Sequence, residues 1–339
     1  MHYLELGCSG LKVAELCLGT MTFGEESGFG APAAESRRIY ERYREAGGNF
    51  LDTANIYNRG TSETLLGDFI ASERQAVVLA SKYSLTTDPA DPNAGGNHRK
   101  NLVQSLEASL RRLRTDYLDL YWVHGWDQAT PLAELMRALD DQVRLGKVLH
   151  LGISNAPGWV VAAANVLARE RGWTPFTALQ LHYNLVERSI EEEFFALAAA
   201  QDLAITAWSP LAGGLLSGKF NRDADPQARA GARLESSPMR SRMLTEQRLE
   251  AAERLAALAR ELGASAAQLA LAWLRQRGGG DVIPILGART LAQLDDNLGA
   301  LKLALAPVTI AELDSLSPPE FRYPRALLDG EFFQRMLHG

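Results

Sequence analysis

The chain has 339 residues, of which 46% are hydrophobic and 22% are charged, and its formal net charge at pH 7 is −6. This composition is typical of a folded globular protein and excludes an intrinsically disordered one. An acidic chain is a poor candidate for a nucleic-acid-binding protein, which normally presents a basic face. The apolar stretches are much shorter than the ~20 residues that cross a membrane, so no membrane-spanning segment is expected.

The cysteine content and the first residues both indicate the cellular compartment. Cys8 and Cys17 are too few for a disulfide-stabilised scaffold in a chain of this length, and they favour a reducing compartment. The opening Met-His-Tyr-Leu-Glu-Leu-Gly shows neither the basic segment nor the apolar segment of a signal peptide. We therefore expect a cytoplasmic protein.

In chain order, the first predicted element is a small β-hairpin. Its strands are Tyr3–Glu5 and Lys12–Ala14, on either side of Gly7 and Gly10. Eight apolar or β-branched runs follow, and several are apolar almost throughout, as is typical of strands buried on both faces of a parallel sheet. These predicted strands are Glu15–Gly19, Asn49–Asp52, Val77–Lys82, Leu118–His124, Val148–Ser154, Ala178–Tyr183, Ala204–Trp208 and Val282–Leu286.

The segments between the strands have the periodicity of amphipathic helices. One apolar stripe, at spacings of three and four residues, is formed by Leu102, Leu106, Leu110 and Leu113. Thr130 and Pro131 predict a helix start. Pairs with the spacing of a capping box are Ser189 with Glu192, Ser265 with Gln268, Thr290 with Gln293, and Thr309 with Glu312.

Eight strands that alternate with helices predict an α/β fold of the (β/α)8 TIM barrel type, although a doubly wound open sheet has a similar rhythm. We expect a single domain over residues 1–339, with the barrel at about 13–305 and a C-terminal tail at about 306–339. A long loop from about Leu211 to Met243 and the tail after Pro318 extend beyond the ~250 residues of a typical barrel.

Polar or ionisable residues close nearly all the predicted strands. In a (β/α)8 barrel the C-terminal ends of the strands meet at one mouth, where reactive groups gather. The sequence therefore predicts an active site at that mouth. The strand-end residues are Gly19-Thr20-Met21, Asp52, Lys82, His124, Ser154-Asn155, Gln180 with Tyr183, Trp208-Ser209, and Gly287 with Arg289.

These residues resemble, in order and approximate spacing, those of the aldo-keto reductase family. The motifs that carry the resemblance are Gly19-Thr20-Met21, Asp52 to Tyr57, Lys82, His124, Ser154-Asn155, Gln180, Trp208 to Leu211, and Ile283 to Arg289 with Gln293 and Asn297. The resemblance covers about residues 3–305 and is strongest for the bacterial branch that includes aryl-alcohol dehydrogenase-like enzymes and the potassium channel β subunits. It implies an oxidoreductase that transfers a hydride from NADPH to an aldehyde or ketone.

The resemblance implies four catalytic residues: Asp52, Tyr57, Lys82 and His124. Hydride addition to a carbonyl carbon leaves an alkoxide that needs a proton, and Tyr57 is the expected general acid. The pKa of a free phenol is ~10, which is too high for efficient donation, and a cation at Lys82 would lower it. Asp52 would hold Lys82, and His124 would orient the carbonyl oxygen. Taken singly, these residues are also typical of a buried ion pair, a packing tyrosine and a core histidine.

The cofactor is expected to bind in a manner unlike that of a Rossmann fold, because no Gly-x-Gly-x-x-Gly motif is present. By resemblance, Ser154, Asn155 and Gln180 would bind the carboxamide of NADPH, and Tyr183 would stack on the nicotinamide. Arg289 would meet the 2′-phosphate and favour NADPH over NADH, or it is an ordinary solvated arginine. The expected cofactor-binding residues are Gly19, Thr20, Met21, Asp52, Ser154, Asn155, Gln180, Tyr183, Trp208, Ser209, Pro210, Leu211, Gly213, Leu215, Ser217, Lys219, Gly287, Arg289, Gln293 and Asn297.

Two other kinds of site are disfavoured. Gly213 to Lys219 match the first seven positions of a phosphate-binding Walker A motif, but Phe220 stands where that motif needs Ser or Thr. No metal is expected, because no cluster has metal-ligand spacing and His182 is isolated.

The substrate site is expected to be apolar. Phe23, Tyr83 and Trp126 each follow a strand end, so they are candidates either for its wall or for loop packing. The aromatic tail would close over the mouth or pack elsewhere. The expected partner is a small carbonyl substrate, and the sequence leaves the oligomeric state open. Two alternative functions are a nucleotide-sensing regulatory subunit like the channel β proteins and another barrel enzyme, such as a lyase or a phosphate-binding isomerase.

Overall fold

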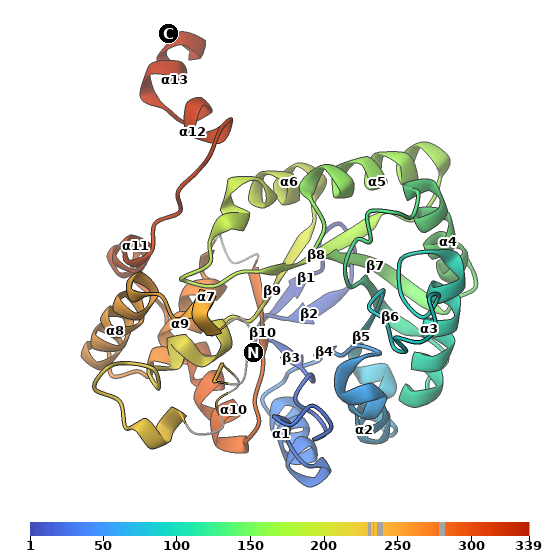
Figure 1. Ribbon diagram of the computed structural model, residues 1–339, viewed down its shortest axis with the longest axis horizontal. Helices are drawn as coiled ribbons and strands as arrows, with labels where there is room; N and C mark the ends of the chain where they lie inside the picture. Colours follow the sequence, from blue (N-terminus) through green and yellow to red (C-terminus); the bar gives the residue numbers. More distant parts are fainter. Residues whose placement is uncertain (230–231, 233, 236–239, 278–281, 339) are drawn as a thin grey trace.

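Parallel strands form a closed barrel at the centre of the molecule (Figure 1). The computed structural model describes residues 1–229, 232, 234–235, 240–277 and 282–338, and within them eight strands pair in the order β10-β3-β4-β5-β6-β7-β8-β9. The (β/α)8 barrel is therefore confirmed, and the open sheet is excluded. The barrel strands are β3 (Cys17–Gly19), β4 (Phe50–Asp52), β5 (Val78–Tyr83), β6 (Leu118–Val123), β7 (Val148–Ser154), β8 (Phe176–His182), β9 (Ala204–Trp208) and β10 (Val282–Leu286).

The barrel strands are buried on both faces, and this explains their continuous apolar character. In β5, Val78 and Ala80 belong to the core inside the barrel, whereas Leu79 and Tyr83 belong to the core between the strands and the helices. Because successive side chains alternate between these two cores, a shift of one residue would exchange them.

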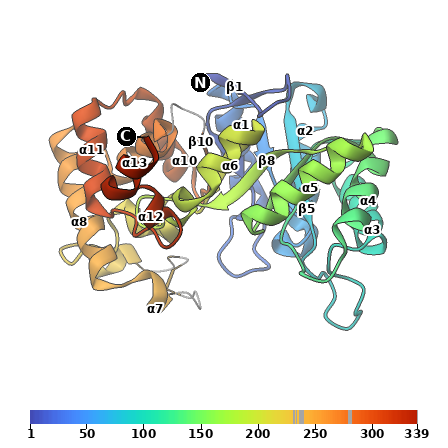
Figure 2. The ribbon, with the colours of Figure 1, turned by 90° about the horizontal axis from the view of Figure 1, so that it is seen from above.

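Helices surround the barrel (Figures 1 and 2). The predicted leucine stripe lies on α3 (Arg99–Leu113), where its four members are buried. The other helices are α1 (Ala33–Glu45), α2 (Thr61–Ile70), α4 (Leu132–Arg144), α5 (Gly158–Arg171), α6 (Phe194–Gln201), α7 (Arg240–Met243), α8 (Glu246–Glu261), α9 (Ala266–Arg275), α10 (Leu291–Leu298), α11 (Pro307–Leu316), α12 (Arg325–Leu328) and α13 (Glu331–His338). No described helix is long and apolar enough to cross a membrane.

The predicted helix starts have mixed outcomes. Ser265 and Gln268 form a complete capping box at α9, and Thr290 caps α10 through the backbone N–H of Gln293. Two predictions are wrong: Ser189 lies inside a 3₁₀ helix, and Thr309 lies inside α11. Helix α4 begins one residue later than predicted, at Leu132, because Pro131 occupies the capping position and the Thr130 hydroxyl donates to Asp127 instead (2.6 Å).

The predicted hairpin is confirmed as strands β1 (Tyr3–Glu5) and β2 (Lys12–Ala14), which pair antiparallel. Leu6, Val13 and Ala14 are fully buried and belong to the core inside the barrel. The hairpin therefore closes the N-terminal end of the barrel.

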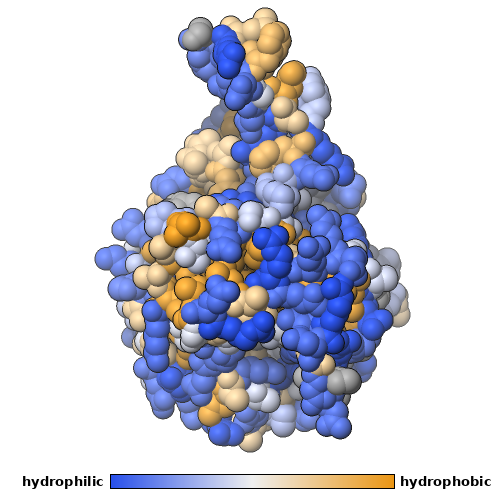
Figure 3. Space-filling model, turned by 90° about the vertical axis from the view of Figure 1, so that its left-hand side faces the viewer, coloured by the Kyte–Doolittle hydropathy of each residue, from blue (hydrophilic) through white to orange (hydrophobic). Residues whose placement is uncertain are grey.

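The long loop and the tail lie on one side of the barrel. The loop predicted from Leu211 to Met243 contains two 3₁₀ segments and α7, and its residues 230–231, 233 and 236–239 lie outside the described residues. After the barrel, α11 packs against α8. Helices α12 and α13 then stand away from the body (Figures 1 and 3), with Tyr323 and Phe332 81% and 76% exposed. None of the tail residues that the structure describes lines the cavity at the mouth of the barrel.

Candidate active site

A cavity of about 470 Å³ lies at the C-terminal end of the barrel. Its lining includes residues at the ends of several strands, such as Gly19, Asp52, Ser154 and Trp208. This volume and this position are those of small-molecule sites in barrel enzymes.

A fully buried ammonium group lies beneath the floor of the cavity. Lys82 has 0% exposure, and its Nζ donates to Asp52 Oδ2 (2.5 Å), to the Thr53 carbonyl (2.8 Å) and to Tyr57 Oη (3.0 Å). These three acceptors match the three N–H groups of an ammonium, so a charge that would be costly to bury alone is fully paired. Burial lowers the pKa of Lys82, but the neighbouring Asp52 and Tyr57 outweigh burial and raise it overall. Lys82 is therefore protonated at neutral pH.

Asp52 connects this lysine to the next part of the site. Its second oxygen, Oδ1, accepts a hydrogen bond from Gln180 Nε2 (3.0 Å), and the side chain lines the cavity. The carboxylate thus holds both the Lys82 ammonium on β5 and the Gln180 amide on β8.

The rings of His124 and Tyr57, which both line the cavity, are nearly perpendicular to each other. The ring centroids are 6.0 Å apart and the planes are at 85°. Burial, and then the charge of Lys82, lower the pKa of His124 to about 3. The imidazole is therefore neutral at physiological pH and can donate one hydrogen bond.

Ser154 and Asn155 form a polar shelf beside His124. The Asn155 amide donates to Ser154 Oγ (2.9 Å) and to the His124 carbonyl (2.8 Å), and Ser154 Oγ donates to the Gln180 carbonyl (2.7 Å). Asn155 holds a φ of 51°, in the left-handed region that asparagine tolerates better than most residues. Another lining residue, Ser209, has a φ of 55°. Such conformations concentrate at functional sites.

Trp208 supplies an aromatic wall, and His182 supports it from behind the cavity. The two rings are stacked, with centroids 4.0 Å apart and an interplanar angle of 8°. Sequence reasoning left His182 isolated. Its position two residues after Gln180 on β8 was the available signal, because residues two apart on a strand share a face.

Two cations, Lys219 and Arg289, meet at the far end of the cavity. Burial, and then the charge of Arg289, lower the pKa of Lys219. The chain turns tightly beside them at Gly214, whose φ is 100° and where a Cβ atom would stand 3.4 Å from Lys219 Nζ. Two like charges that line one cavity create a site suited to an anion.

The structure brings most of the sequence-predicted site residues to this cavity. Its lining includes Gly19, Met21, Asp52, Tyr57, His124, Ser154, Asn155, Gln180, Trp208, Ser209, Pro210, Leu211, Gly213, Ser217, Lys219, Gly287, Arg289, Gln293 and Asn297. Lys82 lies beneath them and is bonded to two of them.

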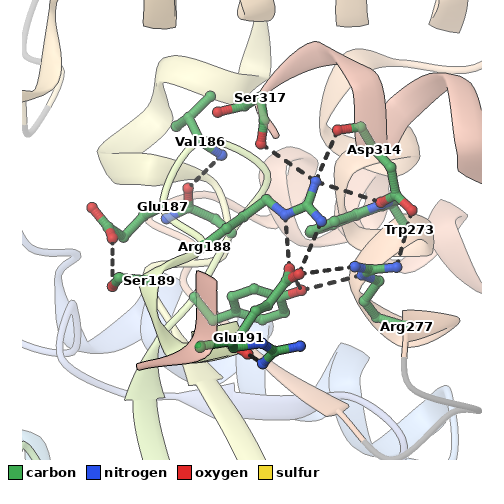
Figure 4. Close-up of polar contacts among 12 residues, drawn as sticks. Val186, Glu187, Arg188, Ser189, Glu191, Trp273, Arg277, Asp314 and Ser317 are labelled. Carbon is green, nitrogen blue, oxygen red and sulfur yellow. Dashed lines mark hydrogen bonds and ion pairs between the residues drawn. The ribbon is translucent and has the colours of Figure 1, made fainter. Parts of the chain in front are cut away.

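Tyr183 requires a correction, because it lies outside the cavity and is fully buried against the helices. Its hydroxyl donates to Glu191 Oε1 (2.5 Å), and its ring packs against Trp273 and Phe195. Figure 4 shows the ion-pair network around Glu191. Side chains alternate between the two faces of a strand, and Tyr183 comes three residues after Gln180. Its side chain therefore points away from the mouth.

The prediction for Tyr83 is wrong for the same reason. It directly follows Lys82, which faces the barrel interior, so its ring faces outward and stacks on Tyr121 at 5.2 Å. Phe23 is also buried, against Phe69 of α2 at 6.0 Å. Neither residue lines the cavity, so neither forms the predicted substrate wall.

Three further predicted residues do not line the cavity. The Thr20 hydroxyl turns toward the Asp52 carbonyl and Ser62, and Leu215 is buried in the apolar core. Trp126 is half-buried, with its backbone N–H bonded to the Asn155 carbonyl (3.4 Å), just behind a residue that does line the cavity.

Some residues that line the cavity received no role from the sequence, and they come from loops, from the end of β10, and from α9 and α10. These are Thr22, Phe29, Ile56, Leu85, Ala267, Leu271, Ile285, Leu286, Ala288 and Asp296. Ile285 and Leu286 end the eighth barrel strand and could have been found by the strand-end rule. No such signal marks Phe29 or Leu85, because loops lack periodicity.

The described residues contain no group of three or more His, Cys, Asp or Glu arranged to hold a metal ion.

A closed (β/α)8 barrel with an ionisable cluster at the floor of its C-terminal cavity has the layout of a barrel enzyme. The model of the aldo/keto reductase family matches residues 15–318. A norsolorinic acid reductase of Emericella nidulans is 36% identical over 96% of this chain and 84% of its own length. The uncharacterized oxidoreductase YrpG of Bacillus subtilis is 37% identical over 94% of this chain and 96% of its own.

An aryl-alcohol dehydrogenase of Phanerodontia chrysosporium, whose name specifies NADP(+), is 35% identical over 96% of this chain and 87% of its own length. The chain therefore belongs to the aldo/keto reductase family, as the sequence motifs predicted, and it is an oxidoreductase.

Proposed function

We propose that this protein transfers a hydride from NADPH to an aldehyde or ketone, with Tyr57 as the general acid. The observation that carries the proposal is the position of the Lys82 ammonium, 3.0 Å from the Tyr57 hydroxyl and 2.5 Å from Asp52. A phenol beside a buried cation is the group in this cavity best able to give up a proton near neutral pH.

The protonation step follows from the local charges. An ammonium that donates to the phenol oxygen stabilises the phenolate that remains after proton donation. Because Lys82 is fully buried, water screens this attraction little. Asp52 keeps the ammonium in place and balances its charge, so the protein does not have to reorganise when the proton leaves.

His124 would position the substrate. Its neutral ring faces Tyr57 edge-on, so a carbonyl oxygen between them could accept one hydrogen bond from the phenol and one from the imidazole. A protonated imidazole would compete with Tyr57 as the acid, and the lowered pKa of His124, about 3, makes this competition unimportant.

The residues at the cavity fit NADPH. Gln180 and the shelf of Ser154 and Asn155 would hold the carboxamide, and Lys219 with Arg289 would hold phosphate groups. NADPH carries a 2′-phosphate that NADH lacks, so a guanidinium at Arg289 that binds this group would favour NADPH over NADH. When bound, NADPH would supply the hydride.

Trp208 takes the role that the sequence assigned to Tyr183. It lines the cavity, and its stacking on His182 fixes the plane of the indole. A fixed aromatic face of this kind would support the nicotinamide ring.

The test is NADPH oxidation measured with a panel of aldehydes, ketones and sugars, in the parent protein and in Tyr57→Phe. Removal of the hydroxyl should lower kcat at least about 100-fold and leave the Kd of NADPH nearly unchanged. Tyr83→Phe is the matched control, because that tyrosine is buried outside the cavity.

Turnover by Tyr57→Phe at the parental rate would refute the assignment of the acid. Tight NADPH binding by the parent without turnover of any carbonyl compound would favour a nucleotide-sensing subunit instead.

A further inference from the structure

An exposed apolar cluster lies beside the cavity and has no part in the chemistry described above. Its aromatic part is the pair Trp126 and Trp159, which follow strands β6 and β7, and Leu85 follows the neighbouring strand β5. Leu85 lines the cavity and is 42% exposed, and Trp159 is 58% exposed. The two indoles meet edge to face, with centroids 5.3 Å apart and planes at 90°.

The cluster is held in a fixed relation to the catalytic groups. The backbone N–H of Trp126 donates to the Asn155 carbonyl (3.4 Å), and the Asn155 amide donates to the His124 carbonyl (2.8 Å). On the other side, Asn97 donates to Ser84 Oγ (3.0 Å) and to the Gly125 carbonyl (2.9 Å), which ties the loop of Leu85 to the loop of Trp126. A rigid platform binds a ligand with little loss of conformational freedom.

Trp159 is not needed to attach its own helix to the barrel. The buried face of α5 is formed by Val160, Val161, Ala164 and Ala168 among others, whereas Trp159 points into solvent from the first turn. An exposed tryptophan leaves a large apolar area in water, and apolar patches that adjoin a cavity are typical of ligand-binding surfaces.

We propose that Trp159, together with Trp126 and Leu85, forms an outer subsite for the part of the carbonyl substrate that extends beyond the reacting group, and that this part is an uncharged aromatic ring. The proposal rests on the carbonyl reductase function proposed above and names the substrate class: aryl aldehydes or ketones with a second ring. Leu85 lines the cavity, and Asn97 ties its loop to the loop of Trp126, which favours a substrate over a protein partner.

The chemistry of the cluster favours an uncharged ring. Two indole faces and an aliphatic side chain offer dispersion and edge-to-face contacts. The ionised residue next to Trp126 is Asp127. Although burial raises its pKa, hydrogen bonds from Asn97 and Thr130 lower the pKa of Asp127 to about 2. Its negative charge disfavours an anionic substituent.

The experiment compares benzaldehyde with biphenyl-4-carbaldehyde in the parent and in Trp159→Ala, with NADPH in excess. The variant should raise KM for the two-ring aldehyde about tenfold, whereas kcat/KM for benzaldehyde should stay within about twofold of the parent. Trp159→Phe keeps an aromatic face and should restore most of the affinity. Leu145→Ala removes another exposed apolar side chain, 65% exposed at the end of α4, and should change neither substrate.

A second measurement does not depend on turnover. Biphenyl-4-methanol should quench the indole fluorescence of the parent, and Trp159→Ala should need about tenfold more of it for half-saturation. If Trp159→Ala affects both aldehydes equally or neither, the outer subsite is refuted. Equal loss with both substrates, accompanied by a change in oligomeric state, would assign Trp159 to a contact between copies of the chain. If the parent reduces neither aldehyde but reduces other carbonyl compounds, the substrate class is wrong and the reductase function stands.

Discussion

Replacement of Glu191 by glutamine removes the central charge of the network behind β8 (Figure 4). The carboxylate accepts two hydrogen bonds from Arg188 (2.7 and 2.9 Å), one from Arg277 (3.0 Å) and one from the Tyr183 hydroxyl (2.5 Å). Arg188 is buried, with 6% exposure, so glutamine would leave its guanidinium with the more distant Asp314 (3.6 Å) as its remaining counter-charge in the network.

The magnitude follows from this burial. Loss of one partner from a buried ion pair costs about 3–5 kcal/mol in the free energy of unfolding. A chain of 339 residues has an unfolding entropy of roughly 0.7 kcal/mol/K near its midpoint, at about 2.1 cal/mol/K per residue. The expected fall in Tm is therefore about 4–7 °C.

Thermal unfolding followed by circular dichroism measures this shift. Glu331→Gln is the matched control, because it makes the same chemical change in an exposed pair with Arg335 and should leave Tm within about 1 °C. The Kd of NADPH should be the same in both variants, since Glu191 and Tyr183 lie outside the cavity. An unchanged Tm for Glu191→Gln would show that the network does not stabilise the fold.

The effect should depend on pH in a defined direction. Burial raises the pKa of Glu191, but Arg188, Tyr183 and Arg277 outweigh burial and lower it overall. A carboxyl whose folded pKa lies below its unfolded value of about 4.3 stabilises the protein above that pH. This contribution is lost as the pH falls through the folded pKa. The difference in stability between parent and Glu191→Gln should therefore shrink below about pH 4.

Three further predictions concern the cavity. Lys82→Met leaves Asp52 buried without its cation, so it should lower kcat at least about 100-fold and should also lower Tm. A kcat within fivefold of the parent would contradict the role of the ammonium. Because the pKa of His124 is about 3, the profile of kcat/KM should show no inflection from this ring between pH 5 and 8; an inflection near 6.5 that His124→Gln abolishes would refute the neutral imidazole. Arg289→Ala should raise the Kd of NADPH at least about tenfold and change that of NADH little, measured by quenching of protein fluorescence; equal effects on both would remove the basis for the cofactor preference.

The barrel could be predicted because its strands are buried on both faces and alternate with amphipathic helices. The ion pair at the floor of the cavity could be predicted because Asp52 and Lys82 lie at the C-terminal ends of adjacent strands, which a barrel brings together. Tyr83 and Tyr183 show the limit of the strand-end rule: both follow an inward-facing residue, and the period of two turns both toward the helices. The alternation of side chains along each strand is thus sufficient to place both rings outside the barrel.

Other features depend on contacts between segments distant in sequence. Ser189 and Ser265 both precede a Glu or Gln by three residues. Of these two serines, Ser265 caps an α-helix and Ser189 does not. The backbone at Ser189 is instead shaped by the neighbouring Arg188, which bonds to Glu191 and to the Ser317 carbonyl. Phe29 and Leu85 reach the cavity because their loops fold over the mouth, and a single sequence carries no period from which to infer this.

The hairpin at the opposite end of the barrel has a kinetic consequence. Since Leu6, Val13 and Ala14 plug that end, the cavity lies on the side of the strand termini, and the cofactor and substrate proposed above would both enter from that side. Whichever of them lies deeper has to enter first and depart last. For the proposed reaction, this architecture favours an ordered sequence of arrivals and departures.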